Sequence, residues 1–160
     1  MLKLETNPAD VATIDSIITA VYDGISGPAG KKRDWDRERS LYIPGARLIP
    51  TAMKAGTGNK DLAPHILDIE GFIARVEPFF EESGFYEKEI ARRTEQVGQM
   101  AHVWSTYESR HNEDDSEPFM RGINSVQLFN DSRRWWIVSI YWQQENARAP
   151  IPEKYLPGAD

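Results

Sequence analysis

The spacing of apolar residues changes once along the chain, from a helical repeat to strict alternation. Residues 8–25 and 68–82 carry apolar side chains at intervals of three and four residues, which predicts two amphipathic helices. Asn7 precedes the first segment as its N-cap, and Asp68 precedes Ile69 at the start of the second. Over residues 86–145 apolar and polar residues alternate, which predicts an antiparallel sheet. Helices first and a meander of strands last is an α+β arrangement.

Shorter signals lie between the two helices. Asp34 could cap a short helix over residues 35–42, ended by the proline and glycine that follow. Residues 46–53 predict a short strand, and the polar, glycine-containing residues 54–61 predict a turn. The strands expected in the second half of the chain are 86–94, 96–110, 119–129 and 135–145. The loops between the last three are short enough for antiparallel hairpins.

The last predicted strand is apolar on both faces, so something other than the helices is expected to cover one of them. Alternation places Trp136, Val138, Ile140 and Trp142 on one face and Trp135, Ile137, Ser139 and Tyr141 on the other. The first set is wholly apolar and is expected to face the helices. The second set mixes rings with hydroxyls, as interfaces do, which predicts a homodimer across that face. The reverse assignment, with the mixed face lining a cavity, stays open.

Composition and charge narrow the class of protein. The 160 residues are the length of a single domain, with a core over about residues 8–145 and an extended tail over 146–160. The absence of cysteine excludes disulfides and cysteine-ligated zinc. A net charge of -6 argues against a general nucleic-acid binder, whose affinity comes from neutralising phosphates. No signal-peptide pattern or membrane-length apolar run is present, so we expect a cytoplasmic protein that does not bind membranes.

Several phrases and the order of elements resemble the nuclear transport factor 2-like superfamily, which includes polyketide-cyclase-like and ketosteroid-isomerase-like proteins. The phrases are GPAGKKRDWDRERSLYIPGARLI, EIARRTEQVGQMAHVWSTYESR, GINSVQLF and RWWIVSIYW. The resemblance covers about residues 8–145 and implies a cystatin-like cone, in which a strongly curved antiparallel sheet wraps around the long first helix. It also implies a cavity between the sheet and the helices. Members use that cavity for isomerisation, dehydration, aldol cyclisation or binding alone, and many members form dimers through the sheet.

His102 is the catalytic candidate, because a neutral imidazole within a predicted strand could act as a base near pH 7. The alternative is a structural histidine that is hydrogen-bonded to a neighbour. The resemblance implies that an aspartate, or an aspartate and histidine pair, transfers protons in the cavity. Candidates by position are Asp23, Asp34, Asp36 and Asp68, although capping or surface roles would explain most of them.

The aromatic residues favour a pocket for a small apolar or aromatic molecule. The ligand-binding candidates are Trp35, Tyr42, His102, Trp104, Asn124 and Gln127. Such a lining is mostly apolar with a few placed polar groups, which is typical of small-molecule sites. Tyr42 is the expected hydrogen-bond donor to the ligand. The alternative is that each ring belongs to the core.

No pattern for a cofactor or a metal ion is found in the sequence. The glycines of residues 24–30 lack the spacing of a phosphate-binding loop. The three histidines, His65, His102 and His111, lack the spacing of a zinc site. The acidic run over residues 113–117 lacks the calcium-loop pattern. We therefore expect neither a metal ion nor a cofactor.

Residues 31–39 hold five basic side chains interleaved with three acidic ones. Neighbouring charges largely compensate in such a pattern, which favours a solvated helix with salt bridges. The alternative is that Lys31, Lys32 and Arg33 lie at a pocket rim and attract an anionic ligand.

Two functions follow. The first is a small-molecule-binding protein, either a lyase or an isomerase, that transfers a proton next to a carbonyl with His102 or a cavity aspartate as base. The second is a non-enzymatic module that dimerises or binds a partner through the sheet. A cavity that contains a carboxylate or an imidazole beside a second polar group would favour the enzyme, and a cavity filled by aromatic rings would favour the module.

Overall fold

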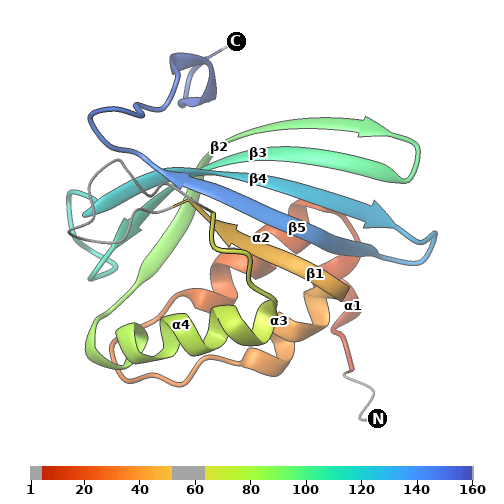
Figure 1. Cartoon of the computed structure of the whole chain (residues 1–160), viewed down its shortest axis with the longest axis horizontal. Helices are drawn as coiled ribbons and strands as arrows, with labels where there is room; N and C mark the ends of the chain where they lie inside the picture. The colour runs from red at the N-terminus through yellow and green to blue at the C-terminus, as the bar shows by residue number, and fades with distance from the viewer. Residues whose placement is uncertain (1–4, 52–63, 160) are drawn as a thin grey trace.

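The structure is a computed structural model and describes residues 5–51 and 64–159. The helices are α1 (Pro8–Val11), α2 (Ile14–Ile25), α3 (Trp35–Leu41), α4 (Ile69–Glu82) and the 3-10 turn η2 (Glu153–Tyr155). The strands are β1 (Tyr42–Pro50), β2 (Tyr86–Val97), β3 (Met100–Arg110), β4 (Met120–Asn130) and β5 (Trp135–Gln144) (Figure 1). The predicted α+β class is confirmed, and the predicted turn over residues 54–61 lies outside the described residues.

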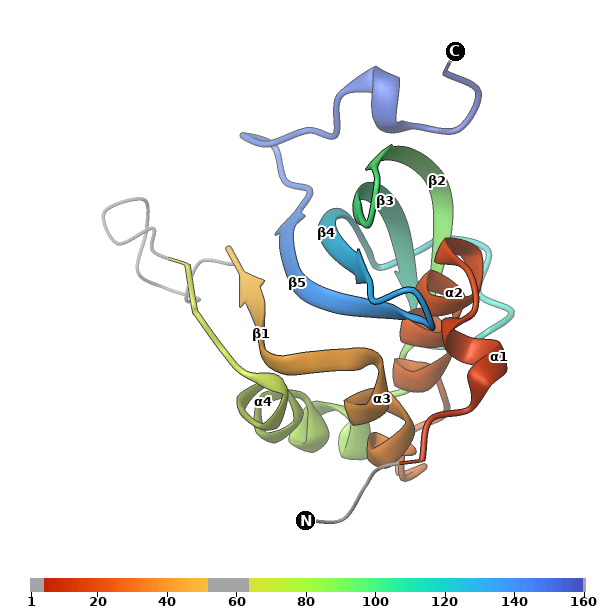
Figure 2. The same ribbon diagram turned by 90° about the vertical axis from the view of Figure 1, so that its right-hand side faces the viewer.

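The five strands form one curved, unclosed sheet in the order β1-β5-β4-β3-β2. Strands β2 to β5 pair antiparallel, as expected, and β1 adds to the edge of β5 in parallel. Figure 2 shows the four helices against the concave side of the sheet and the C-terminal segment beyond its other side. This is the predicted cone, a curved sheet with helices packed against its concave side. None of the described helices combines the length and the hydropathy needed to cross a membrane.

The predicted helix over residues 8–25 is broken into α1 and α2 at Thr13. The Thr13 hydroxyl accepts a hydrogen bond from the main-chain N–H of Ser16, and the Ser16 hydroxyl accepts one from the main-chain N–H of Thr13, both at 3.0 Å. This reciprocal capping box satisfies the free N–H groups of a new helix start. The main chain at Thr13 is extended rather than helical, which ends α1 after a single turn.

Strand β5 changes face in its middle, which corrects the predicted assignment of its two sets of residues. Trp135 and Ile137 are buried in the first half, whereas Ile140 is buried in the second half. The cause is a β-bulge: Leu128 pairs with Ile137 and Gln127 pairs with Ser139, so Val138 has no partner in β4. A bulge adds one residue to one strand and reverses the inward set beyond it.

Trp136 and Val138 therefore do not face the helices as predicted, and Val138 is 36% exposed. Trp142 does face inward, where its ring meets that of Phe72 edge-on at 6.0 Å. Ile137 is wholly buried, so the mixed set cannot form a single outer surface.

The core consists of two clusters. The larger one joins α1 and α2 to the concave face of the sheet, and its fully buried members include Ile17, Leu41 and Val103. The smaller one joins α4 to the start of β2, where the rings of Trp35 and Phe80 stack at 6.2 Å. Burial of these side chains supplies the main driving force for packing the helices on the sheet.

Arg37 of α3 ties the N-terminal segment to the other helices. Its Nε and Nη2 atoms donate to the two carboxylate oxygens of Asp10 at 2.8 and 3.0 Å, and its Nη1 donates to Asp23 at 2.5 Å. The hydrogen bonds from Arg37 lower the pKa of Asp10, whose side chain is buried. Asp10 thus serves as an ion-pair partner of α3 and remains charged at neutral pH.

Glu38 is the least expected residue of the core. Its side chain is 1% exposed, and neither carboxyl oxygen has a hydrogen-bond partner among the described residues. Burial raises the pKa of Glu38 well above its usual range, because it disfavours the charged form of the carboxyl. The group fits against α2 only because residue 24 is glycine: a Cβ atom there would lie 1.9 Å from Glu38 Oε1.

Candidate functional site

A cavity of about 220 Å³ lies between α2, α4 and the concave face of the sheet. Aliphatic and aromatic side chains line most of it, among them Phe72, Phe80 and Trp142. Its polar or charged lining residues are Tyr42, Arg75, Glu87, Tyr107 and Asn124. A concave, mostly apolar space with a few converging polar groups is the usual form of a small-molecule site.

Glu87 brings a carboxyl group into this cavity from β2. Its cross-strand neighbour Ser109 donates a hydrogen bond to Oε2 at 2.9 Å. The main-chain N–H of Glu87 donates to the Ser26 hydroxyl of the α2 C-cap at 3.0 Å, which ties this part of β2 to the helix. Burial raises the pKa of Glu87 to about 7, against the smaller opposing effect of the Ser109 hydrogen bond. A carboxyl with this pKa can both accept and release a proton at neutral pH.

Two tyrosine hydroxyl groups of the cavity lining are available to a ligand. The hydroxyls of Tyr42 and Tyr107 form no hydrogen bond with another described residue, although both side chains are buried and line the cavity. Burial, followed by the nearby charge of Glu87, raises the pKa of Tyr107, so its hydroxyl keeps its proton. The Tyr107 ring passes below Gly122, where a Cβ atom would lie 2.2 Å from the hydroxyl oxygen. Glycine at this position makes room for the hydroxyl.

Of the six ligand-binding candidates, Tyr42 and Asn124 line the cavity. His102, Trp104 and Gln127 lie on the opposite, convex face of the sheet. His102 Nε2 is 2.8 Å from the Ser125 hydroxyl, the Trp104 ring packs on Tyr155, and Gln127 accepts a hydrogen bond from Ser139. The structure therefore does not bring these three residues together with Tyr42 and Asn124.

Trp35 lies in the core next to the cavity. Its ring stacks on Phe80, and its indole N–H donates to Glu77 Oε1 at 2.9 Å. Both contacts are with α4, so Trp35 fixes the position of that helix and is not part of the cavity lining.

The four aspartate candidates all have structural partners outside the cavity. Asp34 and Asp68 are the N-caps of α3 and α4, Asp23 pairs with Arg37, and Asp36 pairs with Arg39. Capping and ion pairing account for these residues. Capping or surface roles were the alternatives given for most of them in the sequence analysis.

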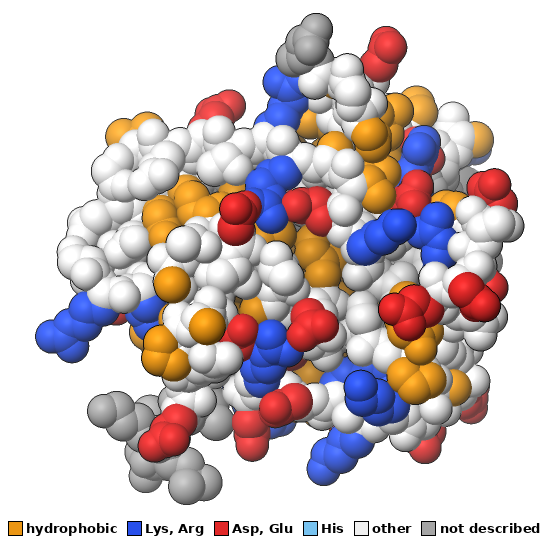
Figure 3. Space-filling view, turned by 180° about the vertical axis from the view of Figure 1, so that it is seen from behind, with side chains coloured by type: hydrophobic (Ala, Val, Ile, Leu, Met, Phe, Trp, Pro, Cys, Tyr) orange, Lys and Arg blue, Asp and Glu red, His pale blue; other side chains and the backbone are white. Residues whose placement is uncertain are grey.

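The basic cluster before α3 divides into buried and exposed members. Arg33 is 4% exposed and donates to four main-chain carbonyls, those of residues 25, 27, 28 and 31. Lys31 and Lys32 are exposed. Figure 3 shows basic and acidic side chains interspersed on the face opposite to that of Figure 1. Arg33 therefore organises the loop after α2, and four of its five N–H donors are already used.

The sequence prediction missed Glu87 and Tyr107. The available signal was the phrase YEKE at residues 86–89, in which two glutamates two positions apart must share one face of a strand. Polar residues on the inward face of a sheet are costly unless they are paired or used. Among the described residues, no three His, Cys, Asp or Glu side chains converge as they would at a metal site.

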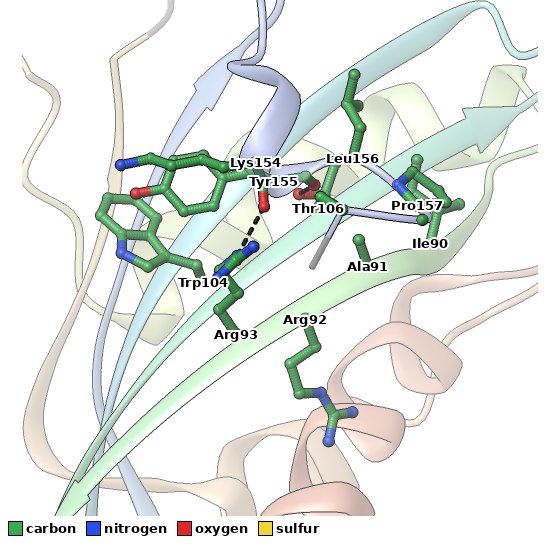
Figure 4. Close-up of a pocket in the computed structure, with 12 residues that line it drawn as sticks. Ile90, Ala91, Arg92, Arg93, Trp104, Thr106, Lys154, Tyr155, Leu156 and Pro157 are labelled. Atoms are coloured by element: carbon green, nitrogen blue, oxygen red, sulfur yellow. Dashed lines mark hydrogen bonds between the residues drawn. The ribbon is translucent and has the colours of Figure 1, made fainter.

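A second pocket, of about 410 Å³, lies on the convex face between β2, β3 and the C-terminal segment (Figure 4). Arg93 Nε donates to the main-chain carbonyl of Lys154 at 2.6 Å, and the Trp104 and Tyr155 rings lie 5.2 Å apart. The Thr106 hydroxyl donates to the carbonyl of Tyr155 at 2.7 Å. The tail was expected to run extended over the surface, but it includes the 3-10 turn η2 and holds closely to the sheet.

No family model matches the sequence, and no curated protein matches it. Solved structures do match. A nuclear transport factor 2-like protein of unknown function from Shewanella baltica OS155 is 18% identical with a TM-score of 0.54, over 84% of this chain and 92% of that chain. LinA is 12% identical with a TM-score of 0.57, over 84% of this chain and 85% of its own.

A ketosteroid-isomerase-like protein from Parabacteroides distasonis ATCC 8503 is 10% identical with a TM-score of 0.56, over 85% of this chain and 91% of that chain. At such identities a structural likeness establishes the fold, while activity has to be argued from the site itself. The chain has the nuclear transport factor 2-like fold, as its sequence predicts.

Proposed function

We propose that this chain binds a small, largely apolar carbonyl compound in the cavity and that Glu87 transfers a proton at the carbon next to the carbonyl, as a lyase or an isomerase does. The observation that carries the proposal is the Glu87 carboxyl, which lines an apolar cavity and whose pKa burial raises to about 7. An acid whose pKa is raised to near neutrality by a mostly apolar cavity is a recurring mark of proton-transfer sites.

Glu87 and the free tyrosine hydroxyls have complementary roles in this proposal. Ionised Glu87 takes a proton from the carbon next to the carbonyl, and the C–H electron pair moves toward the carbonyl oxygen. The hydroxyl of Tyr107 or Tyr42 donates a hydrogen bond to that oxygen as its negative charge develops. Glu87 then returns the proton, either to the same carbon or to another one. The apolar lining excludes water and strengthens the hydrogen bonds at the reacting atoms.

The volume of the cavity limits the size of the ligand. Pockets for drug-sized molecules measure roughly 300–1,000 Å³, whereas this cavity measures about 220 Å³. We therefore propose a ligand with a single ring or a short branched chain. Phe72 and Trp142, whose rings meet edge-on, would contact its apolar part.

Exchange of hydrogen for deuterium next to a ketone tests the proposal. Cyclohexanone and a panel of similar small ketones are incubated with the protein in D₂O, and deuterium incorporation is followed by mass spectrometry. We expect the protein to accelerate incorporation over buffer alone, with a rate that rises with pH through about 7 as Glu87 ionises. Incorporation at the buffer rate for every ketone of the panel would contradict the proposal.

A second candidate function, homodimerisation through the sheet, is favoured by the convex face of β5. Tyr141 is 46% exposed and Val138 is 36% exposed on this strand, and Ile66 beside it is 67% exposed. A shallow depression of about 310 Å³ over this region is lined by Ile49, Ile66 and Tyr141, among others. The C-terminal segment covers β2 and β3, so a second copy would pack on β5, β4 and β1.

Replacing Tyr141 and Val138 with glutamate is expected to convert the proposed dimer into folded monomers, because charges at the centre of an interface lose their hydration. Sedimentation velocity at micromolar concentration measures the change. The matched control is Val97→Glu, since Val97 is 73% exposed at the far end of β2 and should leave the dimer intact. A wild-type protein that sediments as a monomer would rule the dimer out.

A further inference from the structure

A chain of hydrogen bonds runs from the outer groove beside α2 to the wall of the cavity. At its outer end Arg92 pairs with Glu89 at 2.8 Å, and Arg92 also pairs with Asp15. The Ser105 hydroxyl donates to Glu89 Oε2. The Tyr22 and Ser105 hydroxyl oxygens lie 2.7 Å apart, and Asn124 Nδ2 lies 2.9 Å from the Tyr22 hydroxyl.

The outer ion pair fixes the direction of every hydrogen bond in this chain. A carboxylate can only accept hydrogen bonds, so Ser105 must use its single proton on Glu89. The Ser105 oxygen then accepts a hydrogen bond from the Tyr22 hydroxyl, and the Tyr22 oxygen accepts a hydrogen bond from the amide N–H of Asn124. Burial raises the pKa of Tyr22, which therefore keeps the proton that this arrangement needs.

The direction of these hydrogen bonds decides which atom Asn124 can offer to a ligand. The two ends of an asparagine side chain differ only in being donor or acceptor, so the neighbours set its orientation. Here one N–H of Nδ2 is used by Tyr22, which fixes the orientation of the amide, while Oδ1 forms no hydrogen bond with another described residue. Asn124 is 8% exposed and lines the cavity. Among the described residues only the Glu38 carboxyl oxygens are both unpaired and closed to solvent, so Asn124 Oδ1 is accessible to a ligand that donates to it.

We propose that the cavity selects ligands that donate a hydrogen bond to Asn124 Oδ1, so that the carbonyl compound bound here also carries a hydroxyl group or an N–H. This inference rests on the proposed function and names its substrate class: a small hydroxyketone or aminoketone. Glu89, Ser105 and Tyr22 act as positioning residues, since they touch Asn124 or one another and not the ligand.

A matched pair of ligands tests the inference. 4-Hydroxycyclohexanone and 1,4-cyclohexanedione share a ring and one carbonyl, but only the first has a second polar group that donates. We expect wild-type protein to bind the hydroxyketone about tenfold more tightly by titration calorimetry or ligand-observed NMR, which is the size of one buried hydrogen bond. Equal affinities, or tighter binding of the dione, would overturn the inference.

Two alanine variants of β3 test whether the chain of hydrogen bonds orients the Asn124 amide. Ser105→Ala removes the acceptor for the Tyr22 proton, so Tyr22 can donate to Asn124 Oδ1 and the amide can turn its Nδ2 toward the cavity. The preference for the hydroxyketone should then disappear or reverse. Ser109→Ala is the control, because Ser109 lies four residues away on the same strand and donates to Glu87, outside the chain. It should keep the preference for the hydroxyketone.

The outcome stays decisive if Ser105→Ala folds poorly, because Tyr22→Phe breaks the chain at its next member and should also abolish the preference. A preference that survives in both variants would refute the positioning role. Failure here is distinguishable from failure of proton transfer. Deuterium exchange without a preference between the two ligands would leave the proposed function standing, and a preference without exchange would leave only the binding site.

Discussion

Replacing Glu87 with glutamine is expected to lower the deuterium exchange rate about 100- to 10,000-fold, which is the contribution that a positioned general base makes. Glutamine keeps the shape of the side chain and can still accept the hydrogen bond from Ser109. It cannot take a proton from carbon. The rate that remains should lose its rise with pH near 7, because the group responsible for that rise is gone.

The free energy of unfolding of the Glu87→Gln variant should show whether a lower exchange rate comes from lost chemistry or from a lost fold. The pKa of Glu87 is about 7 in the folded chain and about 4.3 in an unfolded one. Between these two pH values the Glu87 carboxyl is protonated in the folded chain but ionised in the unfolded chain. The wild-type protein therefore loses stability as the pH rises through this window. Glutamine does not ionise, so the variant should be at least as stable as wild type at pH 8.

Glu95→Gln is the matched control for Glu87→Gln, since Glu95 belongs to the same strand and is exposed. It should leave both the exchange rate and its pH profile unchanged. A Glu87→Gln variant that exchanges at the wild-type rate would remove Glu87 from the chemistry.

Replacing Arg37 with methionine is expected to lower the free energy of unfolding by about 2–3 kcal/mol, near the lower end for breaking a buried ion pair because Arg37 is partly exposed. The change leaves the buried carboxylate of Asp10 without its two donors and releases Asp23. Denaturant unfolding monitored by circular dichroism measures the difference.

Arg39→Met is the control two positions along the same helix. Arg39 pairs with Asp36 and Glu70, whose side chains are 74% and 61% exposed, so its loss should cost less than about 1 kcal/mol. The Arg37 effect should also depend on pH. Because Arg37 lowers the pKa of Asp10, the effect is fully present above about pH 4 and fades as the pH falls through the lowered value. Equal losses for the two variants would contradict this account.

The sequence predicted the architecture well because most of its elements are strongly periodic. The helix α4 and the strands β3, β4 and β5 lie within a few residues of their expected bounds. The errors lie where a single residue interrupts the period. Thr13 starts a new helix through its capping box, and Val138 is inserted into β5 as a bulge. Neither interruption changes the spacing of the apolar residues on both sides of it, so periodicity alone cannot reveal it.

The candidate site was harder to predict because it depends on which face of each strand turns inward. In β3 both sets of alternating residues mix apolar and polar groups, so the pattern did not decide between His102 and Tyr107. A second bulge, between Glu89 and Ala91, shifts the pairing of β2 with β3 and allows Ser105 to reach Glu89. Tyr42 and Asn124 were selected, together with His102 and Gln127, only as polar groups among the aromatic residues expected around the cavity.

Gly24 of α2 packs directly against Glu38 of α3, so the residues that evolution can accept at the two positions depend on each other. Because a methyl group at position 24 would occupy the place of the Glu38 carboxyl, position 24 has to stay glycine while the Glu38 side chain keeps this position. Alanine at position 24 becomes acceptable only when the side chain at position 38 is shortened or turned away. Lineages that share this α2–α3 packing are therefore constrained to change the two positions together, through intermediates that are either overpacked or hollow.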